Sequence, residues 1–285
     1  MTTPRILIIA GSDSSGGAGI QADIKTVTML GGHAMTAITA VTAQNTRGVS
    51  GVHPIPAQMV LDQIAACVDD IGVDAVKIGM IGSAETAMAV AERLKTLLSS
   101  PQRKLGSRAK KRDAGDPSFR WDDEIGEKGV TIPIVLDPVM VATSGAVLAD
   151  EATIAAFGAL MDVATLTTPN LPELDALGGE AAVLAHGTAL LMKGGHGGGN
   201  EITDRLVDTD GRETCWTEPR IDTPHDHGTG CTLASAIAMG LAEGRALPEA
   251  IARARAFVRA ALRAAPDFVA ENGPMGHQTV RVDQL

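Results

Sequence analysis

The chain has 285 residues, of which 45% are hydrophobic, 20% are charged and only 2% are aromatic. This length and composition suit one large α/β domain or two small ones with an aliphatic core. The formal net charge of −10 excludes the broad basic surface with which proteins bind a nucleic-acid backbone. An anionic small molecule is still permitted, because helix N-termini bind anions locally.

The three cysteines, Cys67, Cys215 and Cys231, are too few and too far apart to form a disulfide framework or a zinc site. The apolar run at the N-terminus, residues 6–10, is too short for the core of a signal peptide or for a membrane span. We therefore expect a cytoplasmic protein with neither a nucleic-acid nor a membrane partner.

The first half of the chain predicts alternating strands and helices. Short apolar runs indicate strands over residues 5–10, 34–43 and 75–79. Apolar residues at helical spacing indicate helices over about 20–27, 60–71 and 83–98. Ser83 is the predicted N-cap of the third helix.

The second half continues the same alternation. Strands are expected at 132–137, 164–168 and 189–193. Residues 202–208 and 213–216 flank the turn sequence TDG and predict a hairpin. Two alanine-rich helices, roughly 231–243 and 247–264, end the chain.

This order predicts an α/β fold, with a doubly wound, mostly parallel sheet and helices on both faces. We expect one domain over residues 1–285, with the polar and highly charged segment 100–129 as a surface insertion. Ligands of such sheets bind beyond the carboxyl ends of the strands. The predicted strand ends carry Gly11, Gln44, Met80, Asp137, Asn170 and Lys193.

Two glycine loops are candidates for binding a phosphate. The first, GSDSSGGAG over residues 11–19, lacks the lysine of a Walker A loop and the spacing of a dinucleotide fingerprint, so a plain strand-to-helix turn remains an alternative. The second, HGTGC over residues 227–231, precedes a helix. Its glycines can aim backbone amides at one spot, and the helix dipole adds positive potential. We expect an anion hole there, with a lowered pKa for the Cys231 thiol; a simple turn is the alternative.

Three further polar positions suggest a metal and phosphate site. Asn170 and Glu173 in the sequence NLPE share a face if the segment is helical, and oxygen ligands of that kind suit Mg²⁺; an ordinary asparagine cap is the alternative. Lys193, at the end of an apolar strand, suits a nucleotide phosphate, unless it is a lysine that extends from the sheet edge to solvent. Asp137, before Pro138, is either a turn residue or a metal-facing carboxylate.

Taken together, these segments resemble the hydroxymethylpyrimidine/phosphomethylpyrimidine kinases of thiamine biosynthesis, in the ribokinase-like superfamily of three-layer sandwiches. The resemblance spans most of the chain in the family's order. It rests on the sequences at 10–26, 42–49, 77–80, 136–140, 168–173, 192–196 and 227–232.

The resemblance implies ATP- and Mg²⁺-dependent phosphorylation of 4-amino-5-hydroxymethyl-2-methylpyrimidine and then of its monophosphate, by a homodimer. Gln44 and Asp23 would bind the ring, in a pocket lined by Gly11, Ala18, Met80 and Val139. Lys193, Asn170 and Glu173 would bind the nucleotide, with Asp137 and Glu173 serving Mg²⁺. Gly228, Thr229, Gly230 and Cys231 would be catalytic.

Cys231 stands where sugar kinases of the superfamily usually carry an aspartate base. A loose phosphoryl-transfer transition state asks little of a base, so we expect the positioning by Gly228–Cys231 to matter more than the basicity of the thiol.

Three other functions stay open from the residues alone. A pyridoxal or pyridoxine kinase shares the fold and the cysteine loop, although Gln44 and Met80 favour the pyrimidine. A cysteine hydrolase or acyltransferase would pair Cys231 with His225 or His227. A pyrimidine-binding protein without activity would not need Asn170, Glu173 and Lys193.

Overall fold

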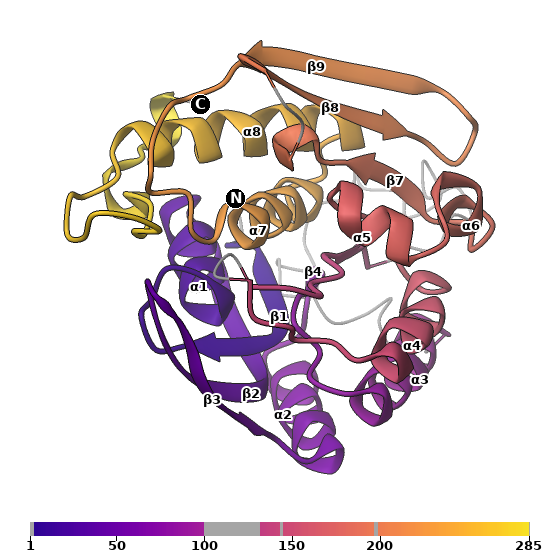
Figure 1. Cartoon of the computed structure of the whole chain (residues 1–285). Coiled ribbons are helices and arrows are strands. Elements are labelled where there is room, and N and C mark those ends of the chain that lie inside the picture. The colour runs from indigo at the N-terminus through magenta and orange to yellow at the C-terminus, as the bar shows by residue number, and fades with distance from the viewer. Residues whose placement is uncertain (1–2, 100–131, 143–144, 197–198, 285) are drawn as a thin grey trace, which may run out of the picture.

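A mixed sheet organises the chain in the computed structural model, which describes residues 3–99, 132–142, 145–196 and 199–284 (Figure 1). The expected insertion at 100–129 lies outside these residues. In the described part the strand order is β3-β2-β1-β4-β5-β6-β7-β8-β9. The strands are β1 (Arg5–Asp13), β2 (His33–Asn45), β3 (Gly48–Pro54), β4 (Ala75–Ile78), β5 (Ile134–Leu136), β6 (Leu166–Thr167), β7 (Ala189–Met192), β8 (Glu201–Val207) and β9 (Glu213–Pro219).

Strands β2, β1, β4, β5, β6 and β7 pair in parallel, and β3, β8 and β9 pair antiparallel at the two edges. The mostly parallel sheet and the hairpin around TDG are therefore confirmed. Strand β3 was not expected, because its exposed sequence lacks an apolar pattern. It forms through pairing with β2.

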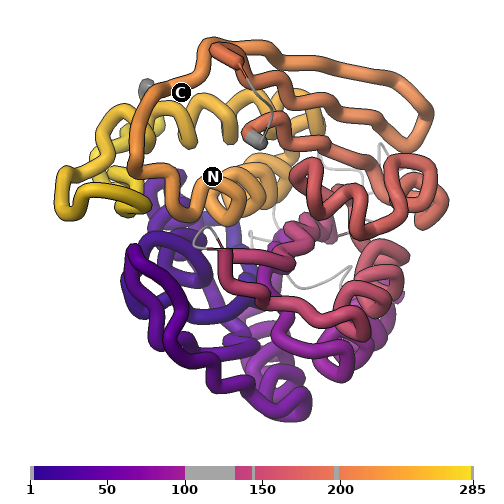
Figure 2. The backbone as a smooth tube through the Cα atoms, in the orientation of Figure 1, coloured from indigo at the N-terminus to yellow at the C-terminus, as the bar shows by residue number. Residues whose placement is uncertain are grey.

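Helices cover both faces of the sheet (Figures 1 and 2). The α-helices are α1 (Gly19–Met29), α2 (Ala57–Asp70), α3 (Ala84–Ser99), α4 (Glu151–Met161), α5 (Leu171–Ala176), α6 (Glu180–Leu184), α7 (Thr229–Ala242) and α8 (Leu247–Arg263). Short 3-10 turns are η2 (Gly194–His196), η3 (His277–Thr279) and η4 (Val282–Gln284). Ser83 Oγ accepts the Thr86 amide at 3.1 Å, as expected for the cap of α3. Helices α4, α5 and α6 were not predicted as elements.

Two apolar cores lie on opposite faces of the sheet. Along β1 the side chains alternate, so that Leu7 and Ile9 join the core under α2, α3 and α4. Ile6 and Ile8 join the core under α1, α7 and α8. This period of two is the consequence of strand pleating, and both sets are fully buried because helices cover both faces.

Irregular pairing occurs at the carboxyl ends of two neighbouring strands. The β1–β2 register shifts between Ala10 and Ser12, and the β2–β3 register shifts between Ala43 and Gln44. Bulges of this kind bend a strand and redirect its side chains. Gly11 and Gln44, both predicted site residues, therefore lie where the regular ladder is interrupted.

The two glycine loops pack against each other at this edge. Gly228 has a φ of 87°, and a Cβ built on it would overlap the carbonyl oxygen of Gly17. A Cβ on Gly17 would in turn overlap the ring of His227. Glycine is required at both positions, because the loops approach too closely for a side chain.

A buried contact between a carboxylate and an imidazole joins the same two loops. Asp13 Oδ2 lies 2.9 Å from His227 Nε2, and the Asp13 carboxylate also accepts the Ser15 hydroxyl and the Ala18 amide. Burial opposes ionisation of Asp13, but the hydrogen bonds from His227, Ser15 and Ala18 outweigh it and lower its pKa to about 2.

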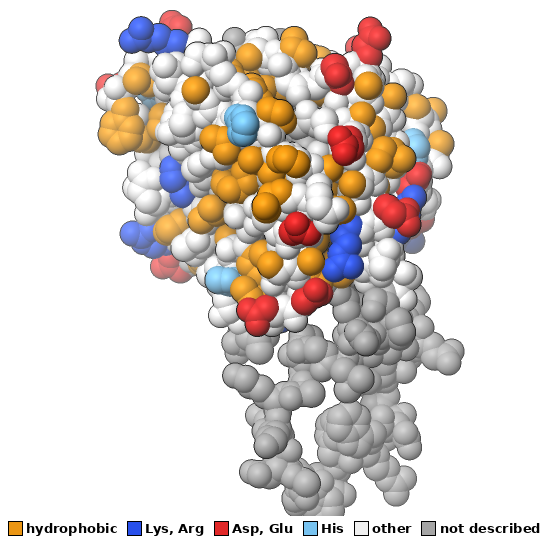
Figure 3. All heavy atoms as spheres, turned by 90° about the horizontal axis from the view of Figure 1, so that it is seen from below, with side chains coloured by type: hydrophobic (Ala, Val, Ile, Leu, Met, Phe, Trp, Pro, Cys, Tyr) orange, Lys and Arg blue, Asp and Glu red, His pale blue; other side chains and the backbone are white. Residues whose placement is uncertain are grey.

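The face of the molecule shown in Figure 3 carries an area of apolar side chains with acidic and basic side chains around it. On the described part of this face the charges of the two signs are interspersed and form no single-sign field. Among the described residues, the helices are too short or too polar to cross a membrane.

The burial of α3 predicts a sharp difference between two of its apolar residues. Leu94 is fully buried, whereas Met88 is 55% exposed on the same helix. We expect Leu94→Ala to lower the free energy of unfolding by about 2–5 kcal/mol, because it leaves a cavity. Met88→Ala is the control, with a change below about 0.5 kcal/mol. Equal losses in urea unfolding would contradict this account of the core.

The hydrogen bonds of the buried Asp13 carboxylate predict a pH dependence of stability. Its pKa is lowered on folding, so its stabilisation is present above its ordinary pKa near 4 and is lost as the pH falls from about 4 to about 2. In Asp13→Asn, about 2 kcal/mol of stability is lost at neutral pH and the slope in this acid window flattens. Asp70→Asn, at an exposed carboxylate, is the control in pH-dependent urea unfolding. An unchanged acid slope in Asp13→Asn would show that the hydrogen-bonded Asp13 carboxylate does not stabilise the fold.

Candidate active site

A cavity of about 1040 Å³ opens at the carboxyl edge of the parallel strands, where the fold class predicts a ligand site. Every predicted site residue except Asp23 lines it. These residues are Gly11, Ala18, Gln44, Met80, Asp137, Val139, Asn170, Glu173, Lys193, Gly228, Thr229, Gly230 and Cys231. Tertiary structure thus brings together residues from seven separate segments.

One end of the cavity suits a small ring with polar edges. The side chain of Met80 covers Gly11, where a Cβ would overlap the Met80 methyl group. Gln44 Nε2 lies 3.4 Å from His227 Nε2, and Gln44 Oε1 lies 3.2 Å from Thr42 Oγ1. An amide has two donor protons and two acceptor lone pairs, so Gln44 keeps capacity for a ligand while these neighbours orient it.

The N-terminus of α7 forms the middle of the cavity. Gly228 is its N-cap in the left-handed conformation, and no side chain caps the first turn. The leading amides of a helix have no partner within the helix. The Thr229 amide donates to the Asp226 carbonyl oxygen at 3.2 Å, whereas Gly230 and Cys231 follow it in the first turn and line the cavity. The anion hole expected at this turn stays a prediction. The Cys231 thiol also interacts with the backbone of Gly19, at the start of α1.

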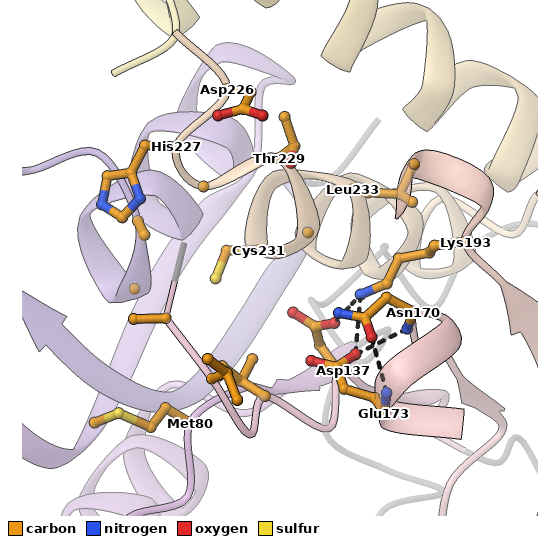
Figure 4. A pocket seen from close by; sticks show the side chains of 18 of the residues that line it. Met80, Asp137, Asn170, Glu173, Lys193, Asp226, His227, Thr229, Cys231 and Leu233 are labelled. Carbon is orange, nitrogen blue, oxygen red and sulfur yellow. Dashed lines mark hydrogen bonds and ion pairs between the residues drawn. The ribbon is translucent and has the colours of Figure 1, made fainter. Parts of the chain in front are cut away.

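The other end of the cavity holds a cation among carboxylates. Lys193 Nζ lies 2.7 Å from Asp137 Oδ1 and 3.8 Å from Glu173 Oε2 (Figure 4). A Cβ on Gly230 would lie 3.3 Å from Lys193 Nζ. The ammonium is therefore adjacent to the N-terminus of α7. Burial opposes this charge, but Asp137 and Glu173 outweigh it and raise the pKa of Lys193.

Asn170 and Glu173 form a capping box at the start of α5. Asn170 Oδ1 accepts the Glu173 amide at 2.9 Å, and Glu173 Oε2 accepts the Asn170 amide at 2.8 Å. The alternative of an ordinary asparagine cap is thus present in the structure, and the capped pair still faces the cavity. Burial raises the pKa of Glu173, and the charge of Asp137 adds to this effect.

The donor set fits Mg²⁺ held together with phosphate oxygens. Mg²⁺ in phosphate-transfer sites is usually bound through one or two carboxylates plus substrate oxygens and water. Asp137 and Glu173 supply two such carboxylates at one end of the cavity. No cluster of three or more His, Cys, Asp or Glu residues suited to a metal occurs in the ranges that the structure describes, so an all-protein cage is not built there.

Two sequence-based predictions are wrong. Asp23 is fully buried and bonded to Lys77 and Ser235, so it does not contact a ring in the cavity; it points from α1 into the core. The pKa of Cys231 is not lowered but raised to about 11. Burial of the thiol, together with the charges of Asp23 and Asp137, outweighs Lys77 and the Gly19 backbone.

Sequence reasoning missed the site-forming roles of Asp13, His227 and Lys77. His227 was considered only as a hydrolase partner, yet its Nε2 atom lies 2.9 Å from Asp13. Figure 4 shows the His227 ring well away from the Cys231 sulfur. With the raised thiol pKa, this argues against a cysteine–histidine nucleophile. One signal was visible for Lys77, because a charged residue within the apolar strand AVKIG requires a buried partner.

Comparison with known proteins agrees with this site. The family model described as phosphomethylpyrimidine kinase matches residues 13–101 and 123–276. A hydroxymethylpyrimidine/phosphomethylpyrimidine kinase from Streptomyces coelicolor is 44% identical over 258 residues, which cover 85% of this chain and 82% of that protein.

Solved structures show the same fold. Bacillus subtilis pyridoxal kinase in complex with ADP superposes with a TM-score of 0.77 and 29% identity, covering 97% of this chain and 98% of the other. Phosphomethylpyrimidine kinase from Clostridium difficile gives a TM-score of 0.69 and 32% identity, covering 91% and 99%. The predicted ribokinase-like fold is thereby confirmed, and the chain belongs to the phosphomethylpyrimidine kinase family.

Proposed function

We propose that the protein transfers the γ-phosphoryl group of ATP to 4-amino-5-hydroxymethyl-2-methylpyrimidine and then to the resulting monophosphate, as a step of thiamine biosynthesis. The observation that carries the proposal is the shared cavity (Figure 4). Gln44 lines one end and Lys193 the other, with Cys231 and the N-terminus of α7 between them. Membership of the family supports the same reaction.

The acceptor ring occupies the end with Gln44, Met80 and Val139. An amide places a donor beside an acceptor, which matches a ring nitrogen beside an amino group. Met80 and Val139 supply apolar contact, and Gly11 and Ala18 let the ring approach the backbone of the first loop. The hydroxymethyl group then points toward Cys231.

The phosphates of the donor occupy the end with Lys193 and the N-terminus of α7. Lys193, beside the N-terminus of α7, is a cation available to their oxygens, while Asp137 and Glu173 are the groups that would hold Mg²⁺. When bound, Mg²⁺ neutralises charge on the phosphate oxygens. The cavity continues past Val258 and Leu262 of α8, where apolar surface suits the nucleoside.

The chain catalyses transfer chiefly by position and electrostatics. The amides of Gly230 and Cys231 face the oxygens that carry charge in the transition state, and they need no reorganisation. A thiol with a pKa of about 11 is protonated at neutral pH, so Cys231 is no preformed thiolate base. It orients the acceptor hydroxyl oxygen, which bonds to the γ-phosphorus while the bond to the β-phosphate oxygen breaks and ADP leaves. The hydroxyl proton passes late to an oxygen of the transferred phosphoryl group.

Three further features belong to the proposal. The same electropositive helix terminus accommodates the monophosphate in the second step, because this acceptor brings its own negative charge. One kinase domain extends over residues 1–285. A homodimer and a cytoplasmic location, expected from the resemblance and the composition, stay predictions.

Phosphorylation of pyridoxal is the second candidate function. It is favoured by the similarity to Bacillus subtilis pyridoxal kinase over nearly the whole of both chains. Against it stands Gln44, whose amide pairs best with an aminopyrimidine edge. Turnover of the pyrimidine, its monophosphate and pyridoxal, each with ATP and with or without Mg²⁺, tests both functions. If neither the pyrimidine nor its monophosphate gave an ATP-dependent product, the proposed pyrimidine kinase activity would be wrong. If pyridoxal were not turned over, the second candidate function would be excluded.

Cys231 provides a direct test of the catalytic assignment. We expect Cys231→Ala to lower kcat with the pyrimidine about 10²-fold and to change KM for ATP little, because the thiol orients the acceptor hydroxyl. Cys215→Ala, at an exposed cysteine on β9, is the matched control and keeps full activity. If kcat of Cys231→Ala equals that of the control, the catalytic role of Cys231 is wrong.

Gln44 provides a test of the acceptor assignment. In Gln44→Ala we expect KM for the hydroxymethylpyrimidine to rise tenfold or more, because buried polar atoms of the ring lose about 1–3 kcal/mol of hydrogen bonding. KM for ATP stays unchanged. Gln58→Ala, at an exposed glutamine on α2, leaves both constants as they were. If only KM for ATP rose, Gln44 would belong to the nucleotide site and not to the acceptor site.

A further inference from the structure

A buried cluster of charges underlies the cavity without lining it. Lys77 Nζ on β4 lies 3.0 and 2.9 Å from the two carboxylate oxygens of Asp23 on α1. Ser235 Oγ on α7 donates to Asp23 Oδ1 at 2.7 Å. All three side chains are fully buried. None of the roles proposed above for the cavity residues involves these three side chains.

The backbone leaves room for this cluster. A Cβ on Gly79 would lie 2.7 Å from Lys77 Nζ, so the glycine after β4 makes space for the ammonium. The cluster also ties together three elements that meet at the site, namely α1, β4 and α7. Burying a charge pair costs several kcal/mol per ion in desolvation, so an apolar core would serve packing at least as well.

Helical geometry places the cluster one turn below the Cys231 thiol. Cys231 and Ser235 are four residues apart on α7, hence on the same face of that helix. Gly19, whose backbone meets the thiol, and Asp23 are likewise four residues apart on α1. The thiol at the amino ends of both helices therefore lies over the carboxylate and hydroxyl one turn further along each.

Four charged groups act on the thiol from the surrounding elements. Lys77 on β4 and Lys193 after β7 are positive, whereas Asp23 on α1 and Asp137 after β5 are negative. Lys77 favours a thiolate, and Asp23 and Asp137 oppose it. Coulomb interactions are strong in a buried environment because the local dielectric constant is low. The charge state of the Asp23–Lys77 pair is thus felt at Cys231.

We propose that Asp23, Lys77 and Ser235 form a positioning cluster for Cys231, in which Lys77 provides a fixed positive charge beneath the thiol and Asp23 offsets it. Ser235 orients the Asp23 carboxylate toward Lys77. The cluster thereby balances the charge beneath the thiol, because Asp23 opposes ionisation of the thiol and Lys77 favours it. The functional meaning rests on the role proposed above for Cys231, but the electrostatic coupling does not.

The test is the pH dependence of Cys231 alkylation by iodoacetamide in the full-length protein without substrates. Labelled peptides identified by mass spectrometry separate Cys231 from Cys67 and Cys215. The midpoint is the pH at which the rate of Cys231 alkylation is half of its maximum. We expect Asp23→Asn to lower this midpoint by at least one pH unit, since Lys77 loses its counter-charge. Asp62→Asn, an exposed carboxylate of α2, should leave the midpoint unchanged. A folded Asp23→Asn variant with the wild-type midpoint would falsify the proposal and leave the cluster a structural ion pair.

A paired substitution covers the case in which Asp23→Asn does not fold. Asp23→Asn combined with Lys77→Met removes both charges at once. We expect this variant to show a midpoint close to that of the wild type, and Ser235→Ala, which keeps both charges but frees the carboxylate, to shift the midpoint measurably. A wild-type midpoint in Ser235→Ala, or a fall of one unit in the doubly neutral variant, would overturn the coupling. Because no kinase substrate is added, failure of the coupling is distinct from failure of the proposed reaction, which the ATP-dependent assays test.

Discussion

The site depends on the close approach of two glycine loops at the carboxyl edge of the sheet. Gly17 and Gly228 leave no space for a Cβ between them, and the contact between Asp13 and His227 joins the same loops. This contact brings the amino end of α1 beside the amino end of α7. The amino ends of two helices therefore converge where Cys231 stands, and each helix dipole contributes positive potential at that point.

Local positive potential of this kind lets a chain with a net charge of −10 bind an anion. Lys193 is one cation of the cavity lining, and it is already partnered by Asp137 and Glu173. Its charge is thus largely balanced, so the N-terminus of α7 adds to the attraction for an anion. Balanced charge of this kind favours a ligand that brings its own cation, as Mg²⁺-bound nucleotides do. A second pair of opposite charges lies buried beneath the cavity, where Asp23 offsets Lys77.

Much of the fold and of the site was predictable from the residues. The alternation of apolar strands and helical segments predicted the parallel sheet, because buried parallel strands read as continuous apolar runs. The strand-end positions Gly11, Gln44, Met80, Asp137, Asn170 and Lys193 all line one cavity. Strand β3 was not predicted, because its stability comes from pairing with β2. The helices α5 and α6 were not predicted either, because they are too short to show a helical spacing of apolar residues.

The sequence by itself determined the order of the elements, the family and the residue types available to the site, since all three follow from local pattern and motif. Only the tertiary structure decided where Asp23 points and how Cys231 ionises. Both depend on partners that are distant in the chain. Lys77 pairs with the carboxylate, and burial together with the charges of Asp23, Lys77 and Asp137 acts on the thiol. Electrostatic free energy is set by distance and burial in three dimensions, and neither quantity can be read from spacing along the chain.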